Sequence, residues 1–413
     1  MATLRPFKGL LPQSKVASRV ASLPYDVLDT HEARELANPD SFLHVIKPEI
    51  DLTDDIPADD PQVYARGKIN LQELVDRGIL SQDGSPCYYI YRQIMGDHVQ
   101  TGLVACASVD EYWSNQVKKH EHTRPDKVRD RVSLMKSLNA QTGPVFLAYK
   151  SQPEVKALIA EAMIGEPLFD FTSFFDIRHI LYRVENPDLV ARIEVAFTKV
   201  PALYIADGHH RSEGAAEYCM YRREAEPEFT GMEEYNFFLT VSFPEDELLV
   251  LPYNRVISDL NGYSAESLLE KIAEQFTVTR KGPDFTGPER LNQFGIYLAG
   301  QWYVMDAKPA LLDGKDAVTG LDVAILQDHV LAPLLGIDDP RTNSRIKFVG
   351  GLDSVTRMKK MVDQGQFAVA FSLFPTRMGQ VMDVADAGKV MPPKSTWFEP
   401  KLLSGMVTHL LDE

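Results

Sequence analysis

The sequence predicts a mixed α/β protein of the α+β type, in which helices are interspersed with several β-hairpins. Residues 87–109 place aromatic and β-branched residues on both sides of Gly96-Asp97, which is a hairpin signal. Residues 294–307, FGIYLAGQWYVMDA, repeat this pattern. Helical patterns such as residues 153–162 lie between the strand-like runs. Because hairpin strands are antiparallel, α+β is favoured over a purely parallel sheet.

The first third of the chain begins with turn-rich sequence. We expect residues 24–27, PYDV, to be extended and a helix to follow them. The acidic stretch 51–61 reads as an exposed loop, and a helix is expected from about Tyr64 to Arg77. After the hairpin at 87–109, another helix is expected, for which Thr123 supplies a cap and Pro125 suits the first turn.

The rest of the chain alternates short apolar runs with helical patterns. The expected strands are 145–149, 179–185, 235–243 and 248–257, and the expected helices are 153–162, 264–275 and 321–335. At about 150 residues per domain, 413 residues suggest two or three domains. We place boundaries near residues 150 and 260, which gives three regions: 1–150, 151–260 and 261–413.

The charge balance argues against several classes of partner. Lysine and arginine number 43 against 59 aspartate and glutamate residues, a net charge of −16. This disfavours binding to nucleic acid or to an anionic membrane surface through a broad basic face. No run of eighteen apolar residues predicts a spanning helix, and the first residues contain no apolar signal-peptide core. Three widely spaced cysteines indicate neither a disulfide framework nor a zinc knuckle, so we expect a cytoplasmic protein. The oligomeric state stays open.

The most informative stretch is residues 202–220, ALYIADGHHRSEGAAEYCM. Residues 203–206 suit a buried strand, Asp207-Gly208 suits a tight turn, and the residues after Ser212 favour helix. The first helical turn then contains His209, His210 and Arg211. Unpaired backbone N–H groups and the positive end of the helix dipole lie in this turn. Cationic side chains oppose that dipole unless an anion binds there. The pattern predicts a phosphate or carboxylate site, and the alternative is a connector with locally bonded histidines.

Residues 118–131, KKHEHTRPDKVRDR, form a basic cluster in an otherwise acidic chain. A solvated helix face explains such a run about equally well. Lys119 and Arg124 are candidate phosphate donors, and Glu121 is a candidate proton acceptor or metal-orienting carboxylate. The spacing His-Glu-His does not match the helical zinc motif H-E-x-x-H, so a histidine metal site is disfavoured and the metal ligands stay unknown.

Two further motifs contain polar groups suited to chemistry. Asp26 in PYDV is either a catalytic carboxylate or an ordinary turn residue. Lys394 in MPPKST, residues 391–396, is either a phosphate donor or part of an ordered surface loop. A Walker A loop, a protein-kinase glycine-rich loop, G-x-G-x-x-G and G-x-S-x-G are all missing from the sequence.

Taken in order, these motifs resemble a known family. PYDV, NPDSFLHVIKPE, KHEHT, DRVSLMKSLNAQTGPVF, ADGHHR and MPPKSTWFEPKLLSG are similar to the domain-of-unknown-function family 1015 over nearly the whole chain. The sequence LPYNR departs from the family pattern at Asn254, where a histidine is expected. DGHHR by itself resembles the ParB and sulfiredoxin-like superfamily, in which a similar turn holds nucleotide phosphates. That superfamily includes nucleotide switches, sulfiredoxin and kinases of free serine.

The resemblance and the local chemistry together imply a phosphotransferase acting on a small hydroxyl metabolite, with L-serine or phosphoserine as the first candidate. A phosphohydrolase with the same site is a close alternative, and a non-catalytic nucleotide-binding regulator is the competing class. ATP or ADP is the implied cofactor, with Mg²⁺ as its possible companion. Glu121 or Asp26 would act as general base or Mg²⁺ orienter, and Asp207 would shape the turn. The implied phosphate-binding residues are Gly208, His209, His210, Arg211, Lys119, Arg124 and Lys394.

Overall fold

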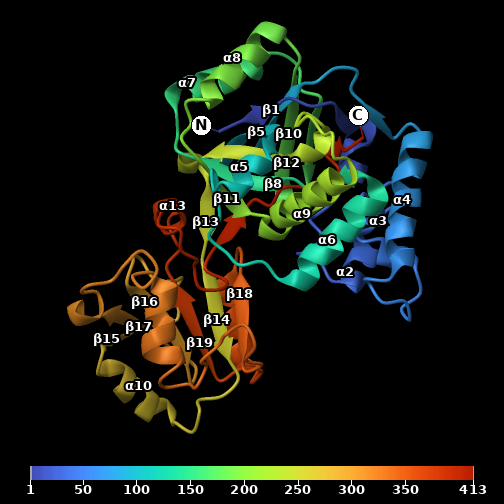
Figure 1. The fold of residues 1–413 in the computed structure, drawn as a ribbon. Coiled ribbons are helices and arrows are strands. Elements are labelled where there is room, and N and C mark those ends of the chain that lie inside the picture. The colour runs from blue at the N-terminus through green and yellow to red at the C-terminus, as the bar shows by residue number, and fades with distance from the viewer. Residues whose placement is uncertain (1, 413) are drawn as a thin grey trace. The chain divides into compact units, whose positions relative to one another are not determined.

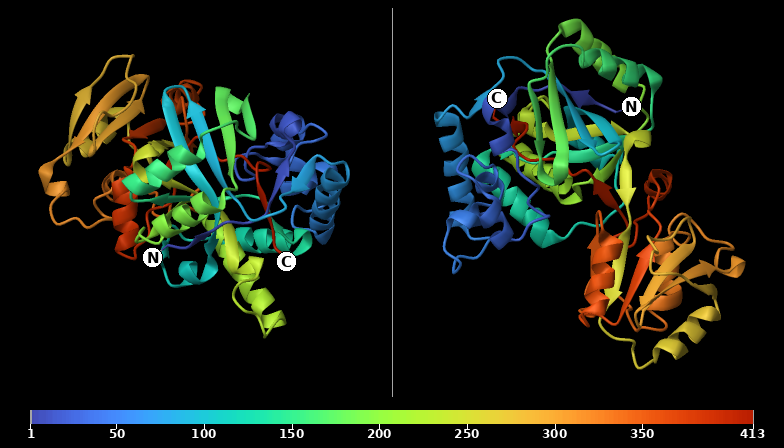
Figure 2. Two further views of the ribbon diagram at one scale, coloured as in Figure 1. Left: turned by 90° about the horizontal axis from the view of Figure 1, so that it is seen from above. Right: turned by 180° about the vertical axis from the view of Figure 1, so that it is seen from behind.

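The computed structural model describes residues 2–412, which divide into two compact units (Figures 1 and 2). Unit 1 contains the chain up to Leu248 together with the residues from Pro400 onward. Unit 2 is the intervening segment Leu249–Glu399. The fold of both units is a mixture of helices and sheets, as the sequence predicts.

A nine-stranded mixed sheet is the centre of unit 1. The strand order is β6-β11-β8-β12-β5-β4-β10-β9, with β1 also paired to β5. Most pairs are antiparallel, whereas β11 runs parallel to β6 and β12 parallel to β8. The strands are β1 Leu4–Arg5, β4 Tyr88–Met95, β5 His98–Ser108, β6 Val117–Lys118, β8 Val145–Tyr149, β9 Phe169–Ser173, β10 Ile177–Val184, β11 Leu203–Asp207 and β12 Phe237–Pro244.

The helices and a smaller sheet complete unit 1. The smaller sheet has the order β3-β2-β21-β7. Its strands are β2 Gly9–Pro12, β3 Leu80–Gln82, β7 Ala140–Gln141 and β21 Thr408–Leu410. The helices are α1 Ala17–Val20, α2 Thr30–Leu36, α3 Leu43–Ile46, α4 Pro61–Asp76, α5 Val109–Trp113, α6 Pro125–Leu138, α7 Pro153–Ala162, α8 Pro187–Phe197 and α9 His209–Ala225.

Helix α9 is held from two sides. Ala215 and Cys219 are buried in the apolar cluster that also contains Val145 and Ile205 of the large sheet. Gly214 faces α6 instead, because a Cβ there would lie 3.2 Å from the Arg131 side chain. Helices α6 and α9 therefore lie side by side, as Figure 1 shows. This packing fixes the N-terminus of α9 beside the C-terminal end of β11.

Unit 2 is built on a six-stranded antiparallel sheet with the order β15-β17-β16-β19-β14-β18. Its strands are β14 Tyr253–Ile257, β15 Phe276–Arg280, β16 Gln293–Leu298, β17 Gln301–Ala307, β18 Ile346–Gly350 and β19 Val369–Leu373, beside the pair β13 Leu249–Leu251 and β20 Trp397–Glu399. The helices are α10 Ala265–Ala273, α11 Asp322–Leu326, α12 Ser354–Asp363 and α13 Met378–Asp386.

Both predicted hairpins form, as β4–β5 and β16–β17. Several local expectations are wrong. Residues 24–27 form a turn, closed by the Val27 N–H donating to the Pro24 carbonyl, and are not extended. The run 248–257 breaks at Pro252 into β13 and β14, since proline cannot donate a ladder hydrogen bond. Arg124, not Thr123, occupies the N-cap of α6, and no side chain caps that helix.

One expected helix, 321–335, is interrupted. Helix α11 ends at Leu326, and the π-helical turn Gln327–Leu331 follows it.

Within residues 2–412, none of the helices combines the length and apolar character that a membrane crossing requires.

Candidate anion-binding site

The segment predicted as strand, turn and helix has that structure. Strand β11 ends at Asp207, Gly208 adopts φ +101° and ψ 28°, and α9 begins at His209. A side chain at position 208 would be strained at this φ, which explains the glycine. No side chain caps α9 and no acidic residue lies in its first turn. The positive end of the helix is therefore left without the carboxylate that usually neutralises it.

Arg211 is the central cation of this turn. Its side chain is 11% exposed, and its Nη2 lies 3.6 Å from Asp207 Oδ1 and 3.9 Å from Asp26 Oδ2. Charge-assisted hydrogen bonds are about 2.7–2.9 Å long, so neither carboxylate is hydrogen-bonded to Nη2 at these distances. Nη1 donates to the Pro144 carbonyl, while the buried Nε has no partner among the described residues. Arg211 thus retains donor capacity.

Asp207 forms an ion pair with a lysine close to the C-terminus. Lys401 Nζ lies 3.0 Å from Asp207 Oδ2. Burial by itself would raise the pKa of Asp207, but Lys401 and Arg211 hold this pKa well below its usual range. A carboxylate with so low a proton affinity is a poor general base. Sequence reasoning missed Lys401, which lies in the quoted terminal block but 194 positions from Asp207.

Two buried histidines adjoin the turn. The rings of His120 and His209 meet edge to face with centroids 4.5 Å apart. Burial lowers the pKa of His120 to about 4. Burial and the neighbouring His120 lower the pKa of His209 well below its ordinary value, so both rings are neutral at pH 7. Glu121 Oε2 lies 3.8 Å from His209 Nδ1, and His209 Nε2 is buried without a partner among the described residues.

The basic stretch before α6 adjoins the same turn. The Arg124 backbone N–H donates to His210 Nε2 at 3.0 Å, which fixes this ring as a neutral acceptor. Burial lowers the pKa of His210. The Arg124 guanidinium itself pairs with Asp126 at 2.8 Å, and Lys119 Nζ lies 4.0 Å from the centre of the Tyr112 ring. Segment 119–124 is therefore beside DGHHR. Its two predicted phosphate donors, Arg124 and Lys119, contact Asp126 and Tyr112.

The remaining predicted donor, Lys394, belongs to unit 2. Its Nζ lies 5.6 Å from the centre of the Tyr253 ring. Asn254, the departure from the family pattern, is fully buried in the same unit. Its side chain donates to Ser354 Oγ and accepts the Leu373 N–H, so Asn254 has an internal structural contact.

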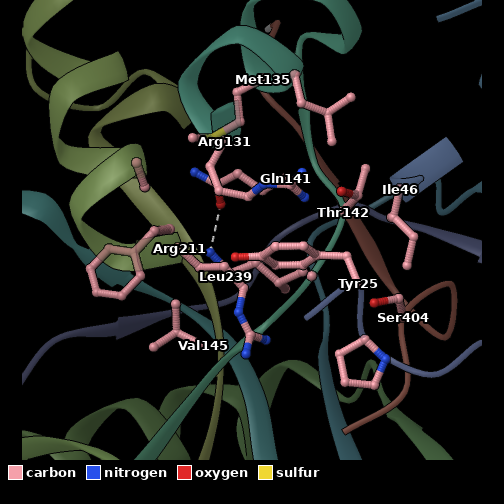
Figure 3. A pocket seen from close by; sticks show the side chains of 15 residues that line it. Tyr25, Ile46, Arg131, Met135, Gln141, Thr142, Val145, Arg211, Leu239 and Ser404 are labelled. Carbon is pink, nitrogen blue, oxygen red and sulfur yellow. Dashed lines mark hydrogen bonds between the residues drawn. The ribbon is translucent and has the colours of Figure 1, made fainter. Parts of the chain in front are cut away.

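Arg211 also lines a small cavity (Figure 3). It measures about 40 Å³ and is lined by Arg211, Tyr25, Arg131, Thr142 and Ser404 among others. The Arg131 guanidinium lies 3.7 Å from the centre of the Tyr25 ring, and burial raises the pKa of Tyr25 to about 12. This volume holds a few water molecules and is far below the roughly 300–1,000 Å³ of ligand pockets. A ligand as large as a nucleotide cannot be enclosed there.

Metal ligands are not grouped around this turn. Across residues 2–412, no set of three histidine, cysteine or acidic side chains is arranged to hold a metal ion. Asp207 already faces Lys401 and Arg211. The described residues therefore present no ready-made cage for Mg²⁺, which is commonly held by one or two carboxylates together with substrate phosphates.

Comparison with protein families identifies the chain. The model of a family described as "Protein of unknown function (DUF1015)" matches residues 4–324. The chain belongs to the DUF1015 family. Among curated proteins, none matches this DUF1015 member in sequence.

Solved structures show distant similarity to this DUF1015 protein. A free serine kinase in complex with AMP is 13% identical, with a TM-score of 0.33, and the match covers 71% of this chain and 86% of that one. C-terminally truncated SbnI from Staphylococcus aureus is 11% identical, with a TM-score of 0.38, covering 73% and 85%. A conserved hypothetical protein from Pyrococcus furiosus is 12% identical, with a TM-score of 0.33, covering 71% and 90%.

Proposed function

We propose that unit 1 is a phosphotransferase that moves a phosphoryl group between a nucleotide and the hydroxyl of a small metabolite. L-serine is the first candidate acceptor and phosphoserine the first candidate product. The assignment of residues 203–225 to a ParB and sulfiredoxin-like phosphate-binding core is part of this proposal. The direction of transfer, and hydrolysis with water as acceptor, are separated by the experiment below.

The observation that carries the proposal is the unsatisfied guanidinium of Arg211 at an uncapped helix start. A nearly buried cation with a partnerless Nε and carboxylates beyond hydrogen-bond distance is costly without a ligand. A phosphate offers several acceptor oxygens that would satisfy this cation and the free N–H groups of α9 together. The hydrogen-bonding capacity of Arg211 and the electrostatics of the helix start therefore both favour a bound phosphate.

The carboxylates around Arg211 have different environments. The low pKa of Asp207 suits it to holding Arg211 and Lys401 in place and not to accepting a proton. The side chains of Asp26 and Glu121 are 39% and 46% exposed, so each is open to a substrate. In the proposed reaction, one of them takes the acceptor hydroxyl proton as the new O–P bond forms. The bond to the nucleotide's leaving oxygen breaks, and Arg211 neutralises the transferred group.

The residues present fit the phosphates of ATP or ADP better than a preformed metal site. A nucleotide would supply the phosphoryl group, and its phosphates would lie on the backbone of Gly208–Arg211 outside the small cavity. His209 and His210 are neutral and would act through hydrogen bonds and shape, not through charge. The described residues form no three-ligand cluster, so Mg²⁺ would be held by the nucleotide phosphates together with one or two of these carboxylates.

Phosphorus NMR of the full chain tests the proposal. Samples would contain ATP or ADP with L-serine, and separately phosphoserine alone or with a nucleoside diphosphate, each with and without Mg²⁺. Appearance of a phosphoserine resonance establishes a kinase, and inorganic phosphate from phosphoserine alone establishes a phosphatase. Arg211→Ala is the matched negative control. Tight nucleotide binding without turnover of any hydroxyl would overturn the enzyme assignment and favour a nucleotide-binding regulator.

A further inference from the structure

Unit 2 contains a buried cation whose charge no carboxylate among the described residues balances. Arg255 in β14 is 3% exposed and is the one fully buried lysine or arginine among residues 2–412. Its Nη1 donates to the Tyr253 carbonyl and its Nη2 to the Lys394 carbonyl at 3.1 Å. Within the described chain, no aspartate or glutamate forms an ion pair with it. Burial accordingly lowers the pKa of Arg255 to about 10.

Three partly buried arginines of unit 1 differ from Arg255 in this respect. Arg131 pairs with Asp130, Arg183 with Asp83, and Arg223 with Asp110 at 2.9 Å. Neutral carbonyl groups satisfy hydrogen bonds but leave the net charge of a guanidinium uncompensated. A buried charge without a counter-charge is expensive, and such charges in proteins are usually paired. Among residues 2–412, no carboxylate compensates the charge of Arg255 in this way.

The loop held by Arg255 also bears an accessible cation. Lys394 is exposed and adopts φ +56°, a left-handed conformation that is unfavourable for a residue with a side chain. Arg255 bonds its carbonyl, while the Ser395 hydroxyl donates to Pro392 and Thr376 donates to the Ser395 carbonyl. These bonds keep a strained backbone in one conformation. They present the Lys394 ammonium at the face of Tyr253.

An aromatic cluster adjoins both cations. Tyr253 meets Trp397 edge to face at 5.1 Å and Phe348 at 5.9 Å, and the Arg255 guanidinium lies 5.3 Å from the centre of the Phe348 ring. Gly350 packs flush against Trp397, since a Cβ there would come within 2.3 Å of the indole. Apolar surroundings lower the local dielectric, so the positive potential of Arg255 is weakly screened.

We propose that unit 2 has an anion site of its own, in which the Lys394 ammonium binds a phosphate-type oxyanion above the buried charge of Arg255. The bound anion would be a free phosphate or the phosphate group of a metabolite. This site does not rest on the phosphotransferase assignment of unit 1. It accounts for two features that packing by itself does not favour, namely an unbalanced buried guanidinium and a lysine in a left-handed conformation.

Titration calorimetry of the full chain tests the proposal with inorganic phosphate, and with pyrophosphate and ADP as further probes. The variants are Arg211→Ala, Lys394→Ala and both together. Lys360→Ala serves as the matched control, because Lys360 is an exposed lysine of the same unit. We expect the Arg211→Ala variant to retain a phosphate site, and Lys394→Ala to weaken that site by about tenfold or more. Lys360→Ala should leave it unchanged.

Each result distinguishes this site from the one in unit 1. Phosphate binding that is identical in the wild type and the Lys394→Ala variant would overturn the unit 2 site and leave the unit 1 proposal intact. If Arg211→Ala abolishes all phosphate binding, no site remains that could depend on Lys394, and the unit 2 site would be overturned as well. Binding that depends on Lys394 but not on Arg211 would support the unit 2 site while counting against the unit 1 proposal. Because Lys394 is exposed, its replacement should preserve the fold, which circular dichroism would verify.

Discussion

Lys401 Nζ lies 3.0 Å from Asp207 Oδ2, joining the C-terminal segment to the end of β11. This ion pair explains how Asp207 remains ionised beside the start of α9 despite the cost of burial. It also places a second cation beside the turn that precedes Arg211. The pair links the stability of unit 1 to the geometry of its candidate site.

Removing Lys401 should therefore destabilise the protein in a pH-dependent way. The pKa of Asp207 is lower in the folded than in the unfolded state, so its contribution is present above about pH 4 and is lost as the pH falls through the folded value. We expect Lys401→Met to lower the free energy of unfolding at pH 7 by about 1–3 kcal/mol. Urea denaturation of Lys401→Met, Asp207→Asn and the double variant measures the coupling. If the losses in unfolding free energy of the two single variants add up in the double variant, the predicted coupling between Lys401 and Asp207 is wrong.

Gly208→Ala should damage both the fold and the site. At φ +101° an added Cβ is strained, and it would lie 3.1 Å from Arg211 Nε. We expect a loss of about 1–3 kcal/mol in unfolding free energy, together with weaker anion binding because Arg211 must shift. Gly379→Ala in α13 is the control, since nothing lies within 4 Å of its added Cβ. Equal melting temperatures for the two variants would show that the turn tolerates a side chain.

Arg211→Ala should abolish most catalysis while leaving the protein folded. Charge-assisted contacts to a transferring phosphoryl group are worth about 2–4 kcal/mol, which corresponds to a decrease of about 30- to 1,000-fold in kcat/KM. Arg222→Ala, on the same helix but about three turns further on, removes an equal charge and should have little effect on kcat/KM. The comparison separates a local role from a change in net charge. A similar loss in both variants would indicate a structural cause.

The exposed carboxylates should be separable by their effect on kcat. Glu121→Gln keeps the shape of the side chain and removes its basicity, so we expect kcat to fall by about 10²- to 10⁴-fold with little change in KM. Asp26→Asn removes a negative charge 3.9 Å from Arg211 and should leave phosphate binding equal or tighter. Steady-state kinetics on both variants checks the assignment. The opposite pattern would make Asp26 the base.

Acid should destabilise unit 1 partly through His179. Burial lowers its pKa to about 4, and Tyr91 Oη lies 2.7 Å from its Nδ1. Below pH 6.5 the unfolded chain takes up a proton that the folded protein excludes, so stability falls until the pH reaches about 4. This histidine should contribute about 2 kcal/mol of the loss between pH 7.5 and pH 5. His179→Gln should reduce that difference in urea melts, and an unchanged pH dependence would contradict the prediction.

The sequence by itself determined the local structure of the candidate site. Strand β11, the Asp207-Gly208 turn and helix α9 follow from an apolar run, a residue that tolerates positive φ, and helix-forming alanines. The hairpin at Gly96 follows from equally local chemistry. Such features depend on a few neighbouring residues, whose backbone preferences are readable in order along the chain.

Only the tertiary structure decided which distant groups meet at that turn. It brings Asp26 to 3.9 Å from Arg211 and Lys401 to 3.0 Å from Asp207. It also separated residues 249–399 as a unit and buried Arg255 within it. These outcomes depend on strand order, on helix packing and on which charges lose water. Those are properties of the whole folded chain that no short stretch of sequence contains.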